Sequence, residues 1–218
     1  CPFEAIEVIN LPNNLNKDPI HRYGENSFAL FSLPTPLFGK VTGVLGKNAI
    51  GKSTAFKILA GLIKANLGQH GAEIEFKEII KYFKGTEMQK FLEKLQKNEI
   101  NLSYKPQQVE LIPKQFNGTV KELLEKIDQK NMFNEVVEKL SLKHFLDTNI
   151  RKVSGGELQR VAIAAAVLKD SNLILFDEPS SYLDIKQRIK VSNYIRSLSN
   201  ENNSILVIEH DLIILDFI

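Results

Sequence analysis

The sequence predicts an α/β fold in which helices cover both faces of a parallel sheet. Residues 172–176 and 204–208 are near-continuous apolar runs, which is typical of parallel strands buried on both faces. Residues 40–45 form another short strand pattern, which leads into a glycine turn and then a helical pattern. Because strands alternate with helical segments, we expect an α/β core in one large domain, whole or divided into two lobes.

The composition is ordinary for a globular protein. Hydrophobic residues make up 43% of the 218 residues, charged residues 25%, and the net charge of +2 is too small to indicate a nucleic-acid partner. The longest apolar runs, such as 161–168, fall short of the roughly 18 residues that a membrane helix needs, and the N-terminus does not resemble a signal peptide. The single cysteine excludes an internal disulfide framework and favours a reducing compartment.

The middle of the chain is predicted to be mostly helical. Residues 52–63 carry apolar side chains at helical spacing, and so do 75–84. Gly85 then interrupts the pattern, and Thr86 with Gln89 forms a plausible capping box for a following helix. We therefore expect a helix-loop-helix over about 75–97. Residues 120–127 and 136–146 are predicted to be helices of a second lobe.

The motif that carries most chemical information is GKNAIGKST at residues 46–54, which matches the phosphate-loop pattern G-x4-G-K-[ST]. Glycines let the backbone wrap a polyphosphate, with N–H groups and a helix N-terminus facing the anion. Lys52 is expected to reach the β- and γ-phosphates, and the Ser53 hydroxyl to bind Mg²⁺. The alternative is a chance glycine turn, which the preceding strand and following helix disfavour. The predicted nucleotide-binding residues of this loop are Gly46, Asn48, Ala49, Ile50, Gly51, Lys52, Ser53 and Thr54.

A second motif places two carboxylates after the apolar run at 173–176. Asp177 lies at the expected strand end, where it suits Mg²⁺ coordination, directly or through water. Glu178 is placed to orient or deprotonate an attacking water. Alone, such a pair is often a solvated strand end. Downstream of a phosphate loop, it indicates nucleoside triphosphate hydrolysis.

A third motif, VSGGELQR at residues 153–160, resembles the signature of ATP-binding cassette (ABC) ATPases, whose usual form is LSGGQ or LSGGE. Its glycines open a helix predicted to run to about Lys169, whose N-terminal amides can bind a phosphate. The alternative is a simple helix-capping turn, which the order of the three motifs disfavours. In the ABC family these residues contact the ATP held by a partner cassette: Ser154, Gly155, Gly156 and Glu157.

The ABC resemblance implies roles for further residues. Gln107 resembles the glutamine that senses Mg²⁺ and water, with Gln108 as the competing assignment, and His210 resembles the switch histidine near the γ-phosphate. A histidine at a strand end is more often a surface residue, but its place in the motif order favours the switch. Ser180 and Asp184 fall in a segment, SSYLD, that resembles the D-loop crossing to the partner. Tyr23 and Phe28 are candidates to stack on adenine, or alternatively core aromatics. The implied metal ligands are Ser53, Gln107 and Asp177, and the implied cofactors are ATP and Mg²⁺.

Several stretches resemble one ABC subfamily, the ABC-E or RNase L inhibitor proteins, which split ribosomes. They are Cys1-Pro2-Phe3, Asn10-Leu11-Pro12, His21-Arg22-Tyr23, Ile112-Pro113-Lys114 and the segment 177–184. The likeness implies the first of two cassettes in a cytoplasmic recycling factor, with partners in the second cassette (or a homodimer mate), the ribosome and translation-termination factors, and no membrane. It also implies that residues 1–3 end an upstream iron–sulfur domain, although one cysteine cannot hold a cluster and could be an isolated residue. We also expect the native chain to continue beyond Ile218.

The resemblance refines the predicted fold to a P-loop NTPase (RecA-like) core with an ABC helical lobe and a helix-loop-helix insertion. The expected division is a core lobe at about 25–75 and 170–218, the helix-loop-helix at about 75–97, and a helical lobe at about 107–169. Lys47, Ala49 and Val153 depart from the usual family pattern, and none of these departures removes a catalytic group. Two alternative functions for such a cassette are a subunit of a membrane transporter and a chromosome-maintenance ATPase. The second is disfavoured because no heptad array separates Lys52 from Ser154.

Overall fold

The computed structural model describes residues 18–217, and the segments at 1–3 and 10–12 that contributed to the resemblance lie outside this range. Its centre is a parallel sheet with the strand order β3-β6-β5-β4. The strands are β3 (Val41–Val44), β6 (Ser204–Ile208), β5 (Leu173–Asp177) and β4 (Leu102–Lys105). A two-stranded antiparallel sheet of β1 (His21–Arg22) and β2 (Ala29–Leu30) precedes it.

Both faces of the central sheet are buried, as the apolar runs predict. Ile174 and Phe176 of β5 belong to one apolar cluster, whereas their neighbours Leu173 and Leu175 belong to another. Successive side chains of a strand point to opposite faces, so a run without polar interruptions supplies both clusters. The register pairs Lys105 with Phe176 and Asp177 with Ile208, so the carboxyl ends of the strands meet at one edge.

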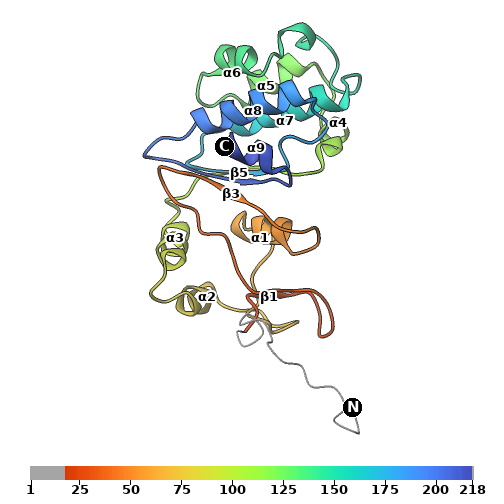
Figure 1. The fold of residues 1–218 in the computed structure, drawn as a ribbon. Coiled ribbons are helices and arrows are strands. Elements are labelled where there is room, and N and C mark those ends of the chain that lie inside the picture. Colours follow the sequence, from red (N-terminus) through yellow and green to blue (C-terminus); the bar gives the residue numbers. More distant parts are fainter. Residues whose placement is uncertain (1–17, 218) are drawn as a thin grey trace.

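One face of the sheet carries the helices that follow β4, β5 and β6 (Figure 1). The long helix α7 packs with α5, α6 and the sheet in one cluster of buried residues. The helices on this face are α4 (Ile112–Gln115), α5 (Val120–Ile127), α6 (Phe133–Lys139), α7 (Gly155–Leu168), α8 (Ile185–Ser197) and α9 (Leu212–Asp216).

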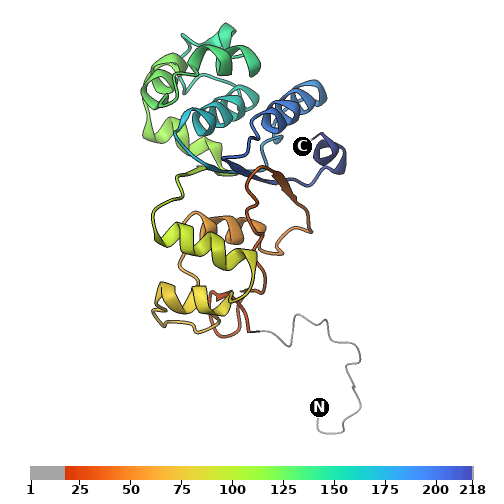
Figure 2. The same cartoon turned by 90° about the vertical axis from the view of Figure 1, so that its left-hand side faces the viewer.

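The other face carries α1 (Lys52–Leu59) and the pair α2 (Phe76–Tyr82) and α3 (Glu87–Gln96), and the view in Figure 2 keeps them on that side. Phe56, Ile79 and Phe91 are buried in the shared cluster. Helices α2 and α3 are the expected pair. Thr86 caps α3 by accepting from the Gln89 backbone N–H, but the Gln89 side chain accepts from Gly85 N–H at 2.7 Å, so the capping box is shifted by one residue.

Two helix boundaries differ from the sequence prediction. The first helix ends at Leu59 rather than near 63, because Gly61 adopts a left-handed φ of 69° and the Leu62 N–H turns back to the Lys57 carbonyl. The helix predicted over 136–146 is wrong in extent: α6 stops at Lys139, Ser141 has a φ of 53°, and a short 3-10 turn follows at Lys143–Phe145. The apolar spacing typical of a helix continues past residue 139 in the sequence, but the left-handed backbone at Ser141 ends the helix there.

Within residues 18–217, no helix is long and apolar enough to cross a bilayer.

Candidate active site

The phosphate-loop motif lies between the end of β3 and the start of α1, at the edge of the sheet where the other parallel strands also end. Gly51 has a φ of 100°, and a Cβ at this position would lie 2.4 Å from Cζ of Phe28. Only glycine combines that conformation with that close approach. Ala49 has a φ of 61°, so the alanine that departs from the family pattern occupies the left-handed region.

The Lys52 side chain reaches across the phosphate loop to the loop's first residues. Its Nζ donates to the carbonyl oxygens of Gly46 at 2.6 Å and Lys47 at 2.9 Å. An ammonium has three N–H groups, so these two bonds fix its position while a third donor stays available to a ligand. The side chain is thereby held next to the cleft into which the loop opens.

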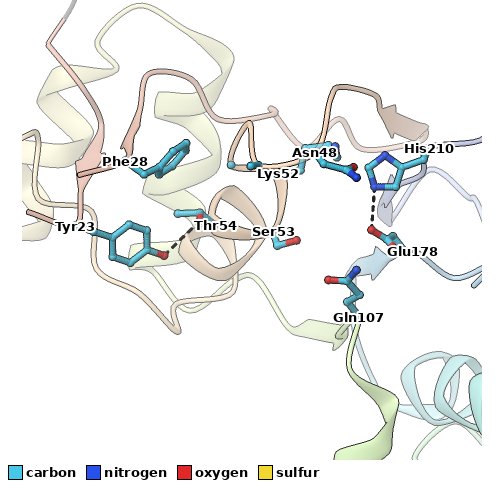
Figure 3. Close-up of a pocket in the computed structure, with 11 residues that line it drawn as sticks. Tyr23, Phe28, Asn48, Lys52, Ser53, Thr54, Gln107, Glu178 and His210 are labelled. Carbon is cyan, nitrogen blue, oxygen red and sulfur yellow. Dashed lines mark hydrogen bonds and ion pairs between the residues drawn. The ribbon is translucent and has the colours of Figure 1, made fainter. Parts of the chain in front are cut away.

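This cleft has a volume of about 480 Å³ and brings together residues from five separate segments. Figure 3 shows Tyr23 and Phe28 at one end, Glu178 and His210 at the other, and the phosphate loop between them. The lining residues are Tyr23, Phe28, Asn48, Ala49, Gly51, Lys52, Ser53, Thr54, Gln107, Glu178 and His210. Gly46 and Ile50 are not in this lining; Gly46 acts through its carbonyl, and Ile50 is 57% exposed.

Asp177 ends β5 beneath the loop and is almost fully buried. Burial raises the pKa of its carboxyl, and hydrogen bonds with Ser53 and Tyr104 oppose that shift. Tyr104 Oη donates to Oδ2 at 3.3 Å, whereas Oδ1 is buried without a hydrogen-bond partner among the described residues. A buried carboxylate oxygen without a donor, beside a serine hydroxyl, is suited to a cation.

Glu178 follows in a left-handed conformation, with a φ of 49°. Its Oε1 lies 2.9 Å from His210 Nε2, and its Oε2 accepts from Ser181 Oγ at 3.2 Å. The Glu178 N–H donates to the Ile208 carbonyl, which ties the turn to the end of β6. The structure thus brings the predicted base and the predicted switch histidine into direct contact.

The two candidate glutamines are separated by the structure. Gln107 lines the cleft, whereas Gln108 is the residue before the 3-10 turn at Val109–Leu111. At the other end of the cleft, Tyr23 Oη lies 3.3 Å from Thr54 Oγ1, and the Tyr23 and Phe28 rings are 6.4 Å apart and tilted by 43°. Two aromatic rings therefore lie next to the first turn of α1.

The signature and D-loop residues lie outside this cleft. Ser154 caps α7 in a capping box with Glu157, so the capping turn that the sequence offered as the alternative reading is present together with the signature motif: the Ser154 Oγ accepts from Glu157 N–H, and the Glu157 carboxylate accepts from Ser154 N–H. Gly155 and Gly156 pack against Tyr182 of the D-loop segment. Asp184 caps α8, and the Ser180 N–H donates to Glu209 Oε1 at 2.8 Å.

Sequence reasoning missed three buried polar residues around the carboxylate turn. Glu209 is 3% exposed, and burial raises its pKa. Lys105 is 1% exposed; burial lowers its pKa to about 8, opposed by nearby carboxylates, first among them Asp177. Gln159 is fully buried on α7. The sequence offered little signal for them: Gln159 lies between Leu158 and Arg160 at the polar start of α7, and Lys105 ends the short strand LSYK, whose pattern is mixed.

Among the described residues, no group of three or more His, Cys, Asp or Glu side chains forms a metal cluster. Mg²⁺ bound with a nucleotide needs none, because it keeps water and phosphate ligands and takes only one or two from protein carboxylates. The pairing of Ser53 with Asp177 fits that pattern.

Comparisons with known proteins agree with this geometry. The family model described as ABC transporter matches residues 37–181. An uncharacterised ABC transporter ATP-binding protein of Methanocaldococcus jannaschii is 50% identical over all of this chain, which covers 36% of that protein. The crystal structure of an archaeal ribosome recycling factor with the ribosomal stalk protein aligns with a TM-score of 0.86 and 51% identity, over 91% of this chain and 38% of that one.

A model of a ribosome-bound archaeal complex of Pelota and an ABC-E protein aligns over 100% of this chain and 36% of that one, with a TM-score of 0.88 and 49% identity. The chain therefore spans little more than a third of the proteins that it matches. It has the P-loop NTPase α/β fold of an ABC cassette, and such a cassette binds nucleotide.

Proposed function

The chain belongs to the ABC family, as the first nucleotide-binding domain of the ABC-E type, and we propose that it binds and hydrolyses ATP as one cassette of a ribosome-splitting factor. The observation that carries the ATPase proposal is the cleft itself. It joins the phosphate loop, a glutamine, a glutamate and a histidine that come from positions as distant as 48 and 210.

In this proposal Glu178 orients and deprotonates the attacking water. Its carboxylate lines the cleft, and Ser181 and His210 hold its two oxygens. A carboxylate placed at the end of the phosphate loop can accept a proton as the water attacks the γ-phosphorus. His210 keeps the carboxylate in place and presents its ring to the γ-phosphate, while Gln107 lies next to Glu178 at the same end of the cleft (Figure 3).

Lys52 and the loop amides would bind the β- and γ-phosphates, and Tyr23 with Phe28 would flank the base. Ser53 Oγ, Gln107 and the Asp177 carboxylate would hold Mg²⁺, which neutralises charge on the phosphate oxygens. The orphaned Oδ1 of Asp177 supports this assignment, because its burial without a donor is costly unless a cation compensates it.

The signature residues are proposed to serve a different nucleotide. Ser154, Gly155, Gly156 and Glu157 lie outside the cleft, on the N-terminus of α7, where backbone N–H groups can meet a γ-phosphate. In an ABC pair that phosphate belongs to the second cassette or a homodimer mate, and Ser180 and Asp184 cross to the same partner.

The decisive experiment is Glu178→Gln. The change keeps the shape and removes the base, so ATP affinity should stay within about 2-fold while kcat falls by about 10²-fold or more. Stopped assays of phosphate release and a fluorescent-nucleotide titration measure the two quantities. Wild-type turnover at saturating Mg²⁺ and ATP would remove Glu178 from the mechanism. Lys126→Gln, on the exposed side of α5, serves as the matched surface control.

The ribosomal part of the proposal rests on the ABC-E relationship and on the helix pair. We extend it to a cytoplasmic protein and to partners among the ribosome and termination factors. The lobe boundaries at 25–75, 75–97, 107–169 and 170–218 belong to the same proposal.

The segment 75–97, which contains α2 and α3, has six lysines and four glutamates, a net charge of +2 that favours contact with RNA phosphates; the alternative is a solvated outer face. Its lysines are all exposed: Lys77, Lys81, Lys84, Lys90, Lys94 and Lys97. Internal pairing uses little of this charge. Lys90 meets Glu87 at 2.7 Å on the open surface, and Glu93 accepts from Gln89 Nε2. Such surface pairs contribute little, so the lysines stay available to phosphates.

A triple variant, Lys81→Ala, Lys84→Ala and Lys90→Ala, tests the contact. Each lysine–phosphate contact contributes about −0.7 to −0.9 to the slope of log affinity against log salt, so ribosome affinity should fall and the slope flatten. ATP binding should not change. The matched control replaces three exposed lysines on the opposite side of the sheet: Lys121, Lys126 and Lys143. An equal effect in both variants would leave α2–α3 as a solvated face.

A further inference from the structure

The backbone of Glu178 adopts a conformation that its side chain disfavours. A φ of 49° at a residue with a Cβ is costly and persists only where surrounding groups impose it. The turn directly follows β5 and aims the carboxylate into the cleft. The groups that impose this conformation therefore determine where the proposed base points.

Two buried side chains converge on this turn. Lys105 Nζ donates to the Asp177 carbonyl at 2.9 Å and to the Glu178 carbonyl at 3.2 Å. Gln159 Nε2 donates to the same Glu178 carbonyl at 2.7 Å. Both side chains are at most 1% exposed, so water does not compete for these bonds. One carbonyl oxygen thus receives a cationic and a neutral donor together.

The two donors come from elements that also carry other proposed site residues, namely β4, which leads to Gln107, and α7, which begins with the signature. Lys105 is the last residue of β4, two positions before Gln107, and its pairing with Phe176 places it beside the end of β5. Gln159 lies on α7, five positions after the signature serine, Ser154. The glutamate turn is therefore clamped between the glutamine loop and the signature helix.

A lysine is unusual in this position, and its surroundings explain how it is tolerated. Burial of an ammonium is costly unless it is paired and hydrogen-bonded. Here the nearby carboxylates of Asp177, Glu209 and Glu178 favour its charge, and two backbone carbonyls accept hydrogen bonds from it. Its charge balances the acidic cluster at the strand ends while its bonds fix the backbone.

We propose that Lys105 and Gln159 are positioning residues for hydrolysis: they hold the Glu178 carbonyl and so keep its carboxylate aimed at the attacking water. This inference rests on the proposed role of Glu178 as the base. Neither residue touches the nucleotide in this scheme. Substituting either one should therefore slow the chemical step and leave ATP binding intact. Loss of a purely structural residue would instead lower stability, binding and turnover together.

The test uses Lys105→Met and Gln159→Leu, which remove the donors at similar volume, in the full-length protein that contains this cassette. A base displaced by about 1 Å costs up to about 10²-fold, so we expect kcat to fall by about 10- to 100-fold for Lys105→Met, and less for Gln159→Leu. The KM and Kd for ATP should stay within about 2-fold. Lys126→Met, the same change at an exposed site, should behave as wild type.

The distinguishing measurement repeats both substitutions in a Glu178→Gln background. If they act through the base, they should lower the residual turnover there by less than about 2-fold, because residues acting as a unit are not additive. Equal losses in both backgrounds, or wild-type kcat for both single variants, would overturn the inference. If Lys105→Met does not fold, Gln159→Leu decides alone. Wild-type turnover of Glu178→Gln itself would instead refute the proposed function.

Discussion

Two helices of this cassette have glycine at their N-termini, in the cap of α1 and in the first turn of α7, and the two ends differ in how their N–H groups are satisfied. Helix α1 follows Gly51, with no side-chain capping bond and no acidic residue in its first turn. Helix α7 follows Ser154, which caps it in a reciprocal pair with Glu157. The first N–H groups of α1 are thus left to a ligand, whereas two donors at the start of α7 already have partners within the chain.

In the proposed function, this difference accounts for the assignment of the α1 site to the cassette's own ATP and of the α7 site to the ATP of a partner cassette. Around α1, Lys52 adds a positive charge to that of the helix dipole. At α7 the Glu157 carboxylate already lies beside the positive end of the helix, and Tyr182 covers the glycines. A phosphate at α7 would therefore need a lysine and a magnesium ion from elsewhere, which in the proposed function come from the phosphate loop of a second cassette.

The largest effect on this difference between α1 and α7 is expected from removing the positive charge of Lys52. Lys52→Ala deletes a charge-assisted contact to the phosphates, each such bond being worth about 1.5–3 kcal/mol, so ATP affinity of the isolated cassette should fall by about 10- to 100-fold or more. Ser154→Ala should leave that affinity unchanged. Calorimetric titration of both variants checks the contrast, and an equal loss in both would place the signature in the cis site.

A mixing experiment sharpens the comparison. The isolated cassette should hydrolyse ATP slowly, with a rate per chain that rises with protein concentration, because a complete site needs the signature of a second chain. Lys52→Ala and Ser154→Ala should each lower turnover by about 10-fold or more. Mixed together, they form one intact pairing, the phosphate loop of the Ser154→Ala chain with the signature of the Lys52→Ala chain. Turnover should therefore recover in part, whereas brisk, concentration-independent turnover in the wild type would contradict the composite site.

The smallest effect concerns strain in the open loop before α1. Ala49 occupies a left-handed conformation, which costs about 1–2 kcal/mol for a residue with a Cβ. Ala49→Gly removes that cost and adds about 0.4–1 kcal/mol of unfolded-state entropy, so the free energy of unfolding should rise by about 0.5–1 kcal/mol. Ala60→Gly, at a φ of −77°, should lower it instead. Chemical denaturation measures both, and a loss in Ala49→Gly would show that the loop is not strained.

Local rules explain the elements that the sequence determined. Strands β3, β5 and β6 and helices α5 and α7 lie within a residue or so of their predicted positions, because apolar periodicity and capping residues are local signals. Three motifs also fixed the family and most of the cleft residues. Strand β4 and helix α8 were not identified, since the mixed pattern of LSYK and the polar face of α8 carry weaker periodic signals.

Only the tertiary structure decided which residues support the site. Lys105 meets the carbonyl of a residue 73 positions away, and Gln159 meets it from another helix. Neither residue stands out in the sequence, and their shared partner follows from the parallel register of β4 with β5 and from the packing of α7 on the sheet. Register and packing depend on the whole apolar core, so a contact between distant segments cannot be derived from either segment alone.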